Sequence, residues 1–295
     1  MSLQEKFTGT GIAIITPFLE DNRTIDWSTL DNLIDFWIEN KVEYLVVCGT
    51  TGESATLTRE EEQEVFTFVK EHTRGRVPLV AGVGGNDTYE VLEAFKEMDF
   101  SGYDAILSVA PYYNKPRQEG LYQHYKALND ATPLPIIMYN VPGRTGMNVS
   151  AETTLRIAND CKNIFATKEA SGNFDQINSI MKNKPEAFMV ISGDDGIALP
   201  MIACGAKGVI SVVANAYPRD FSEMIRLCLQ GNFAEALPIH LKYTDVITSM
   251  FTDGNPSGVK QYLFEMGRCK NTMRLPVVPV SAAHAKKISG MMSDL

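Results

Sequence analysis

The feature of this sequence that most constrains its fold is a regular alternation of strand-like and helix-like segments. Short runs of apolar and β-branched residues, which are typical of buried strands, alternate with segments whose apolar residues recur at helical spacing. The strand-like runs cover residues 11–17, 44–47, 78–81, 105–109, 136–139, 164–168, 188–192 and 208–213. The helix-like segments between them cover residues 26–40, 59–72, 88–98, 118–129, 151–160, 174–182 and 197–203.

Eight strand-like runs separated by helices predict a closed barrel. Strict alternation favours a parallel sheet, and eight βα units favour the (β/α)8 architecture of the α/β class, the TIM barrel. A doubly wound open sheet is the alternative, but no Gly-x-Gly-x-x-Gly motif follows the first strand. The rest of the chain is mainly helical, with amphipathic spacing over residues 221–229, 233–248 and 257–266. We therefore expect a catalytic barrel at residues 1–225 and a small C-terminal helical domain at residues 226–295.

Charge, hydropathy and cysteine content argue against several classes of function. The formal net charge of -9 disfavours a nucleic-acid partner, because no basic stripe is present to neutralise phosphates. No apolar run reaches the length of a membrane span, and the N-terminus lacks a signal-peptide pattern. The five cysteines form no C-x-x-C pair, and the four histidines are scattered along the chain. We expect a cytoplasmic protein with reduced thiols, no membrane partner and no metal site.

Lys168 is the most informative single residue, because it stands at the end of the sixth strand-like run. Alternation along a strand would place Ile164, Ala166 and Lys168 on one face. Burial lowers the pKa of a lysine and so raises the fraction of neutral amine, the form that attacks carbonyl groups. The alternative is that the strand ends before Lys168 and the ammonium group reaches water.

Further polar residues follow other strands, where the active sites of (β/α)8 barrels lie. Thr50 and Thr51 stand between glycines after the second strand and could donate hydrogen bonds to a carboxylate or phosphate, or cap the next helix. Tyr139 alternates onto the same face as Ile137, so its phenol can point toward Lys168. Arg144, in a Pro-Gly loop, could bind a substrate carboxylate or lie free on the surface.

Two more pairs of polar or aromatic residues leave alternatives open. Tyr112 and Tyr113 follow the fourth strand, where they could pack, form an interface or relay protons. Asp194 and Asp195 follow the seventh strand, and we favour a chain-reversing turn over a divalent cation site. Taken together, an amine, a phenol, a hydroxyl pair and a guanidinium on one rim are the groups required for imine chemistry on an anionic carbonyl substrate.

Three of these segments together resemble a known family. Gly-Thr-Thr-Gly-Glu at 49–53, Tyr-Asn-Val-Pro-Gly-Arg-Thr-Gly at 139–146 and Lys-Glu-Ala-Ser-Gly at 168–172 resemble the signatures of the dihydrodipicolinate synthase and N-acetylneuraminate lyase family. The likeness extends over essentially the whole chain and preserves the order of the motifs. It implies a lyase of the class I aldolase type, which uses a lysine Schiff base and needs neither an organic cofactor nor a catalytic metal.

The resemblance also implies catalytic roles for four residues. Lys168 would form a Schiff base with the keto carbon of pyruvate. Tyr139 would shuttle protons and would be linked through Thr51 to Tyr113. In the family the second tyrosine comes from a neighbouring subunit of a homotetramer, built as a dimer of dimers. We therefore expect the same assembly here.

Substrate-binding roles follow from the same resemblance. Thr50 and Thr51 would bind the pyruvate carboxylate, and Arg144 would bind the carboxylate of aspartate semialdehyde. Backbone groups of Gly193 and Ile210 would line the pocket. The implied reaction condenses pyruvate with L-aspartate-4-semialdehyde to give 4-hydroxy-tetrahydrodipicolinate, in the diaminopimelate route of lysine biosynthesis.

Many synthases of this family are inhibited by lysine at a dimer interface, which implies an allosteric site here as well. The alternative for this acidic region is an ordinary solvated helix. The matching positions are Ser54, Ala55, Glu62, Asn86, Glu90 and Tyr112.

The sequence is also compatible with two other functions. Another pyruvate-dependent lyase of the family, such as N-acetylneuraminate lyase, would share Lys168, Tyr139 and the two threonines. Arg144 favours a small carboxylated aldehyde over a polyhydroxylated sugar. A catalytically inactive barrel that binds a metabolite is the second alternative, and it is disfavoured because the amine, phenol and hydroxyls are all retained.

Overall fold

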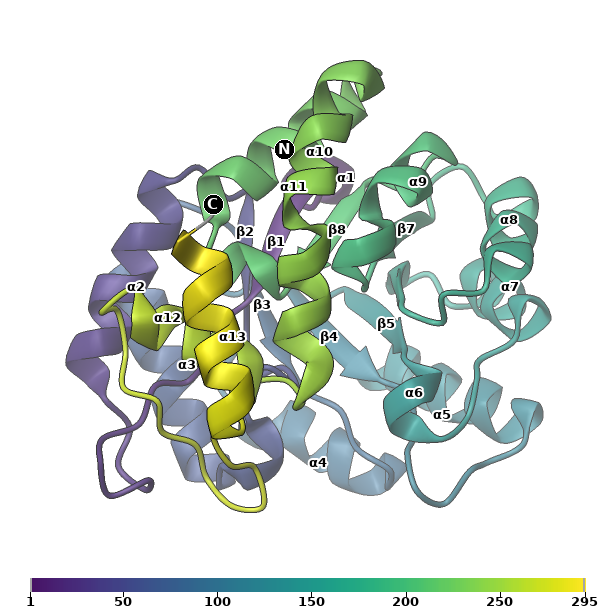
Figure 1. Cartoon of the computed structure of the whole chain (residues 1–295). Helices are drawn as coiled ribbons and strands as arrows, with labels where there is room; N and C mark the ends of the chain where they lie inside the picture. Colours follow the sequence, from purple (N-terminus) through teal and green to yellow (C-terminus); the bar gives the residue numbers. More distant parts are fainter. Residues whose placement is uncertain (1, 294) are drawn as a thin grey trace.

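The computed structural model describes residues 2–293 and 295, and its eight parallel strands close into a barrel (Figure 1). The last strand pairs with the first, which closes the sheet and confirms the predicted (β/α)8 fold. The strands are β1 (Gly9–Ala13), β2 (Tyr44–Val47), β3 (Leu79–Gly82), β4 (Ala105–Val109), β5 (Ile136–Asn140), β6 (Ile164–Glu169), β7 (Met189–Ser192) and β8 (Gly208–Ser211).

Helices follow the strands and surround the barrel (Figure 1). Their starts are set by local capping, as in α3, where Thr58 and Glu61 form a capping box that satisfies the first free N–H groups. The helices up to the end of the barrel are α1 (Leu3–Lys6), α2 (Trp27–Glu39), α3 (Arg59–Thr73), α4 (Thr88–Glu97), α5 (Gln118–Ala131), α6 (Pro142–Thr145), α7 (Ala151–Asp160), α8 (Phe174–Asn183), α9 (Ala198–Ala203) and α10 (Pro218–Leu229). Short 3-10 turns are η1 (Ser54–Thr56), η2 (Asp195–Ile197) and η3 (Val213–Asn215).

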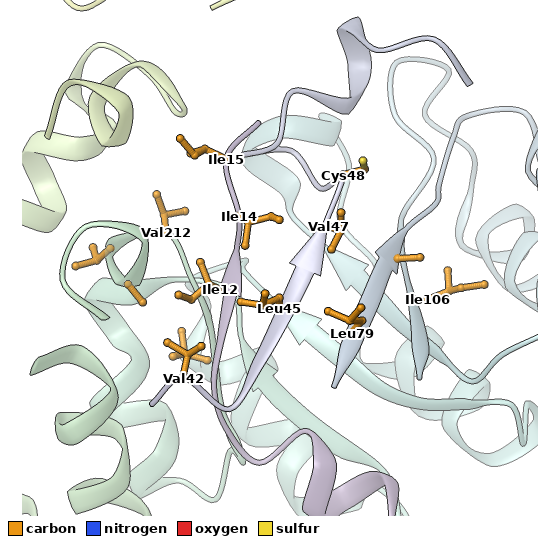
Figure 2. Close-up of a cluster of buried hydrophobic side chains, with 14 of the residues drawn as sticks. Ile12, Ile14, Ile15, Val42, Leu45, Val47, Cys48, Leu79, Ile106 and Val212 are labelled. Carbon is orange, nitrogen blue, oxygen red and sulfur yellow. The ribbon is translucent and has the colours of Figure 1, made fainter. Parts of the chain in front are cut away.

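Alternating side chains divide the interior into two hydrophobic cores. Along β2, Leu45 and Val47 face the surrounding helices, whereas Tyr44 and Val46 face the barrel axis. Figure 2 shows part of the outer core, around β1, β2 and β3. In the inner core, Phe7 packs edge-on against Tyr44 with ring centroids 5.2 Å apart. Gly11 faces Tyr44, and no larger residue fits there because a Cβ on Gly11 would lie 2.1 Å from the tyrosine ring.

β1 differs from its prediction. It begins two residues earlier than the run at 11–17 and ends at Ala13, so that Gly9 and Thr10 pair with β8. The backbone N–H of Ile14 still donates to the Val46 carbonyl of β2, but the buried residues after it leave the sheet. The backbone N–H of Ile15 donates to the side chain of Asn215 rather than to a neighbouring strand. Apolar character alone therefore overestimated the length of this strand.

β6 contains an irregularity that the alternation rule did not anticipate. Ile136 pairs with Ile164, but Ile137 pairs with Ala166, so Phe165 is an extra residue in the ladder. Ile164 consequently packs in the outer core and Ala166 in the inner core. The expectation that Ile164 shares a face with Ala166 and Lys168 was wrong, because a bulge reverses the alternation at this point.

The helices after the barrel are α11 (Phe233–Thr252), α12 (Ser257–Glu265) and α13 (Ala282–Ser293). In Figure 1 they lie beside the barrel, coloured light green to yellow. α11 packs against α10 and against η2 and η3, the turns that follow β7 and β8. The expected domain boundary between residues 225 and 226 falls within α10, and the division into two domains stays a prediction. Across residues 2–293, no helix is both long enough and apolar enough to cross a membrane.

Candidate active site

A cavity of about 560 Å³ opens at the carboxyl ends of the strands. Its floor includes Ala13 and Leu107 at the top of the inner core. The loops after several strands supply its polar walls. Six residues predicted for catalysis or substrate binding line it, namely Thr50, Thr51, Tyr139, Arg144, Lys168 and Gly193.

Lys168 projects from β6 into this cavity and is only 5% exposed. The register of β5 and β6 pairs Tyr139 with Lys168, and the lysine Nζ lies 4.2 Å from the centroid of the phenol ring. Burial lowers the pKa of Lys168 to about 7, the nearby Asp195 carboxylate opposes this shift, and the Arg144 guanidinium adds to it. A large fraction of Lys168 is therefore neutral amine near pH 7.

Tyr139 is 6% exposed, and burial raises its pKa to about 12. The Arg144 guanidinium opposes that shift, and the Asp194 carboxylate adds to it. The phenol therefore stays protonated at neutral pH, so its hydroxyl can both donate and accept a hydrogen bond beside the amine.

Gly193 follows β7, and because it has no side chain it leaves room for the side chain of Lys168. A Cβ at this position would lie 3.1 Å from both Cγ and Cε of Lys168, and 2.8 Å from the Cβ of Ala170. The backbone N–H of Gly193 donates to the Glu169 carbonyl of β6, which fixes the two strand ends together. A glycine at residue 193 thus allows close packing against the side chain of Lys168.

The loop between β2 and α3 presents the two threonines differently. Thr50 is exposed at the cavity wall, whereas Thr51 is only 2% exposed. The Oγ1 atom of Thr51 accepts a hydrogen bond of 2.9 Å from Asn255 Nδ2. Within the described residues, the backbone N–H groups of Thr50 and Thr51 have no protein acceptor. They are therefore available to an anionic ligand.

Arg144 lies on α6, the short helix after β5, and its exposed side chain lines the cavity. The base of this loop is held by a buried network. Asn140 donates to Glu169 Oε2 at 3.1 Å, and Gln176 donates to the same oxygen at 3.2 Å. The backbone N–H of Val149, beyond the loop, donates to Asn140 Oδ1 at 3.0 Å. The start of the arginine loop is therefore tied to β6, and its end is tied to Asn140 at the end of β5.

Two of the residues predicted for catalysis or substrate binding lie outside the set of cavity-lining residues. The side chain of Tyr113 is 87% exposed, with a left-handed backbone at a φ of 71°, so its ring faces solvent in this chain. Ile210 is 1% exposed and packs in the inner core on β8. Neither residue contributes to the cavity that the described residues form, and their roles stay predictions.

Two further residues, Asp195 and Asn255, affect the site in ways that the sequence did not indicate. Asp195 is buried, and its Oδ2 atom accepts from the backbone N–H groups of Val212 and Val213 at 2.9 and 3.1 Å. Burial raises its pKa to about 6. Asn255 is 204 residues from Thr51 along the chain, so no local motif could have linked the two. In the part of the chain that the structure describes, no cluster of three or more potential metal-ligating side chains occurs.

Five of the six predicted allosteric residues line the same cavity. Ser54, Glu62, Asn86, Glu90 and Tyr112 line it, whereas Ala55 is exposed outside it. Burial raises the pKa of Glu62 to about 7, and the neighbouring Arg59 guanidinium opposes this shift. The Glu62 carboxyl is therefore only partly ionised near neutral pH.

Comparison with known proteins accounts for this arrangement. The model of the dihydrodipicolinate synthetase family matches residues 6–295. The chain belongs to this family. A protein of Phocaeicola vulgatus named 4-hydroxy-tetrahydrodipicolinate synthase is 52% identical over 293 residues, which cover 99% of this chain and 98% of the relative. A protein of the same name from Parabacteroides distasonis is 53% identical, with 97% and 96% covered.

Solved structures agree with the family assignment. A dihydrodipicolinate synthase of Aquifex aeolicus superposes with a TM-score of 0.94 at 42% identity, covering 98% of each chain. The enzyme from Acinetobacter baumannii, solved with pyruvate, has a TM-score of 0.94 at 38% identity, covering 97% of this chain and 98% of its own. The enzyme from Cyanidioschyzon merolae, solved with lysine bound, has a TM-score of 0.93 at 38% identity, covering 98% of each chain.

Proposed function

We propose that this chain condenses pyruvate with L-aspartate-4-semialdehyde to give 4-hydroxy-tetrahydrodipicolinate, as a lyase in the diaminopimelate route to lysine. The observation that carries the proposal is the buried amine of Lys168, whose pKa lies at about 7 in a cavity shared with Tyr139 and Arg144. The curated relatives at 52% and 53% identity bear the name of this activity. They favour it over a sialic acid lyase or an inactive metabolite-binding barrel.

In the proposed reaction, the neutral amine of Lys168 adds to the keto carbon of pyruvate, and water leaves to give an imine. Loss of a methyl proton converts the imine into an enamine, whose terminal carbon attacks the aldehyde of the semialdehyde. The amino group of the semialdehyde then displaces Lys168 and closes the ring. Tyr139 is placed to move protons in these steps, because its hydroxyl stays protonated and its ring lies 4.2 Å from the lysine nitrogen.

Two anion sites would orient the substrates. The unpaired N–H groups of Thr50 and Thr51, together with the Thr51 hydroxyl, are suited to the pyruvate carboxylate. The guanidinium of Arg144 is suited to the carboxylate of the semialdehyde. Gly193 would contribute backbone to the pocket, and Ile210 would support it from the inner core.

A coupled assay tests the choice of acceptor. With pyruvate and aspartate semialdehyde, the protein should form the cyclic product, and a Lys168→Met variant should lose more than about 10³-fold in rate because it has no nucleophile. With N-acetylneuraminate it should release no pyruvate. Cleavage of N-acetylneuraminate without turnover of the semialdehyde would contradict the proposal.

We further propose that lysine inhibits the enzyme by binding near Ser54, Ala55, Glu62, Asn86, Glu90 and Tyr112. The carboxylates of Glu62 and Glu90 would face the ligand's ammonium groups. A related synthase solved with lysine bound supports this proposal. Activity should fall with rising lysine concentration, and Glu90→Gln should weaken the inhibition. A flat activity curve up to millimolar lysine would exclude it.

Finally, we propose a cytoplasmic homotetramer, a dimer of dimers in which Tyr113 reaches the active site of a neighbouring subunit. The exposure of the Tyr113 ring supports this arrangement, because a large aromatic in water gains from being covered. The five cysteines are all free, which suits a reducing compartment.

A further inference from the structure

Three residues from the part of the chain after α10 contact the loop that carries Thr50 and Thr51. This threonine loop, residues 48–53, lies between β2 and η1. Asn255, between α11 and α12, donates from Nδ2 to Thr51 Oγ1 at 2.9 Å. Lys260 Nζ and the backbone N–H of Arg274 donate to the two carboxylate oxygens of Glu53 at 2.5 and 3.0 Å. Glu53 and Lys260 are both buried, and Glu53 has a left-handed backbone with a φ of 56°. The loop conformation therefore depends on residues of the chain beyond the barrel's βα units.

The position of Asn255 is itself fixed by close packing. α12 approaches α11 so tightly that a Cβ on Gly258 would lie 2.1 Å from the carbonyl oxygen of Met250. Ser257 donates from Oγ to the carbonyl of Val278 at 2.7 Å. These contacts hold the turn between the two helices against the cavity, which Asn255 also lines.

The direction of the Asn255 hydrogen bond has a chemical consequence. A threonine hydroxyl has one proton to donate and two lone pairs to accept with. The Asn255 amide occupies a lone pair of Thr51 Oγ1. Among the hydrogen bonds between described residues, none uses the Thr51 hydroxyl as a donor, so its proton is free for a ligand in the cavity.

We infer that Asn255 is a positioning residue for Thr51, which holds the hydroxyl so that its proton is directed to the carboxylate of pyruvate. The inference rests on the proposed function, because it assigns pyruvate as the ligand. Asn255 acts through Thr51 and the threonine loop. The C-terminal segment therefore contributes to substrate affinity as well as to the fold.

A double-mutant cycle tests this role. The variants Asn255→Ala, Thr51→Val and the combined variant are compared by steady-state kinetics at saturating semialdehyde. Asn255→Ala should raise KM for pyruvate about five- to tenfold, the loss expected for one net hydrogen bond. Its kcat should fall by a smaller factor than KM rises, because the carboxylate contact is made equally in the ground state and the transition state. In the Thr51→Val background, the same substitution should change KM by less than about twofold.

Asn271→Ala is the matched control. Like Asn255, Asn271 lies after α10 and donates a side-chain hydrogen bond, in this case to Gln261 at 2.6 Å, but it has no hydrogen bond to the threonine loop. It should leave KM for pyruvate unchanged even if it lowers the melting temperature. An unchanged KM in Asn255→Ala, or the same KM increase with and without Thr51, would overturn the inference. Failure of the proposed function is a separate result, since wild-type protein would then form no reducible pyruvate adduct at Lys168.

Discussion

The burial of Lys168 determines the pH range in which its amine can act as a nucleophile. Because burial lowers its pKa to about 7 from 10.5, the neutral fraction rises as pH increases through 7 and is nearly complete one to two units above it. The rate of adduct formation with pyruvate should therefore fall about tenfold per pH unit below pH 7 and level off above it. Quenching with borohydride at successive times, followed by intact mass, measures this rate.

Asp195 provides a control on the origin of that pH dependence. Its carboxylate raises the pKa of Lys168, so Asp195→Asn should move the acidic limb of the profile to lower pH. The amide oxygen of asparagine can still accept the two backbone hydrogen bonds that Asp195 receives. A limb that moves to higher pH, or a rate that keeps rising well above pH 7, would contradict this account of the amine.

The absence of a side chain at Gly193 leads to a second prediction. Gly193→Ala would place a Cβ 3.1 Å from Cγ and Cε of Lys168 and 2.8 Å from Ala170, so the lysine must shift. We expect adduct formation to slow by about tenfold or more, because small displacements of a reacting group are costly. The remote control Gly290→Ala, where nothing lies within 4 Å of the added Cβ, should keep the wild-type rate. Equal rates in both variants would show that the space at residue 193 is not needed.

Single residues of the site were predictable where their strand context was clear. Lys168 and Tyr139 lie near the ends of strands that were recognisable from apolar runs, and the two threonines follow another such strand. The structure brings all four to one cavity. Asn255 was not predictable, because its partner is 204 residues away. Long-range hydrogen bonds of this kind leave no periodic trace in a sequence.

At the level of elements, the loop that carries Arg144 is fixed by a buried carboxylate. Glu169 accepts from Asn140 and Gln176 and from the backbone N–H of Ser171, the last at 2.7 Å. Glu169→Gln would place an amide donor among these donors, and we expect it to lower the free energy of unfolding by about 1–3 kcal/mol. Denaturant unfolding measures this loss.

The control for that substitution is Glu265→Gln. Glu265 is exposed and also accepts side-chain hydrogen bonds, from Gln261 and Ser289. Water can replace those partners, so Glu265→Gln should change the free energy of unfolding by no more than about 0.5 kcal/mol. Similar losses in both variants would mean that burial of the Glu169 network adds nothing to stability.

Strands and amphipathic helices with regular patterns were easier to predict than very short helices or irregular pairing. β2, β4 and α7 begin and end where the sequence indicated, because their apolar patterns match a buried strand or an amphipathic helix. The four-residue helix α6 was missed, since it is too short to show helical periodicity. The bulge at Phe165 was missed because an inserted residue changes pairing without changing composition.

For the whole molecule, we propose that the helices after α10 form a C-terminal domain that serves the barrel directly. α12 is almost entirely buried, and its Lys260 pairs with Glu53 of the threonine loop. The amphipathic spacing predicted α11 and α12, but the place of the C-terminal helices against the carboxyl ends of the strands depends on tertiary contacts that no local pattern encodes.

The proposed assembly leads to a complementation experiment. If Tyr113 serves a neighbouring subunit, a Tyr113→Phe variant should keep its fold and lose activity, because the phenol that would relay protons is gone. Mixing it with inactive Lys168→Met subunits should restore part of the activity, since some hybrid sites then contain both groups. Light scattering establishes whether the hybrids are dimers or tetramers. No recovery in a confirmed hybrid assembly would show that each subunit supplies its own Tyr113.

The most direct test of the central claim is the site of a pyruvate adduct. After incubation of the folded protein with pyruvate and borohydride, peptide mass mapping should find a reduced three-carbon carboxylic acid adduct on Lys168. Lys184 and Lys260, whose pKa values are also lowered by burial, should stay unmodified because both lie outside the cavity. An unmodified Lys168, or an adduct on another lysine, would contradict the account.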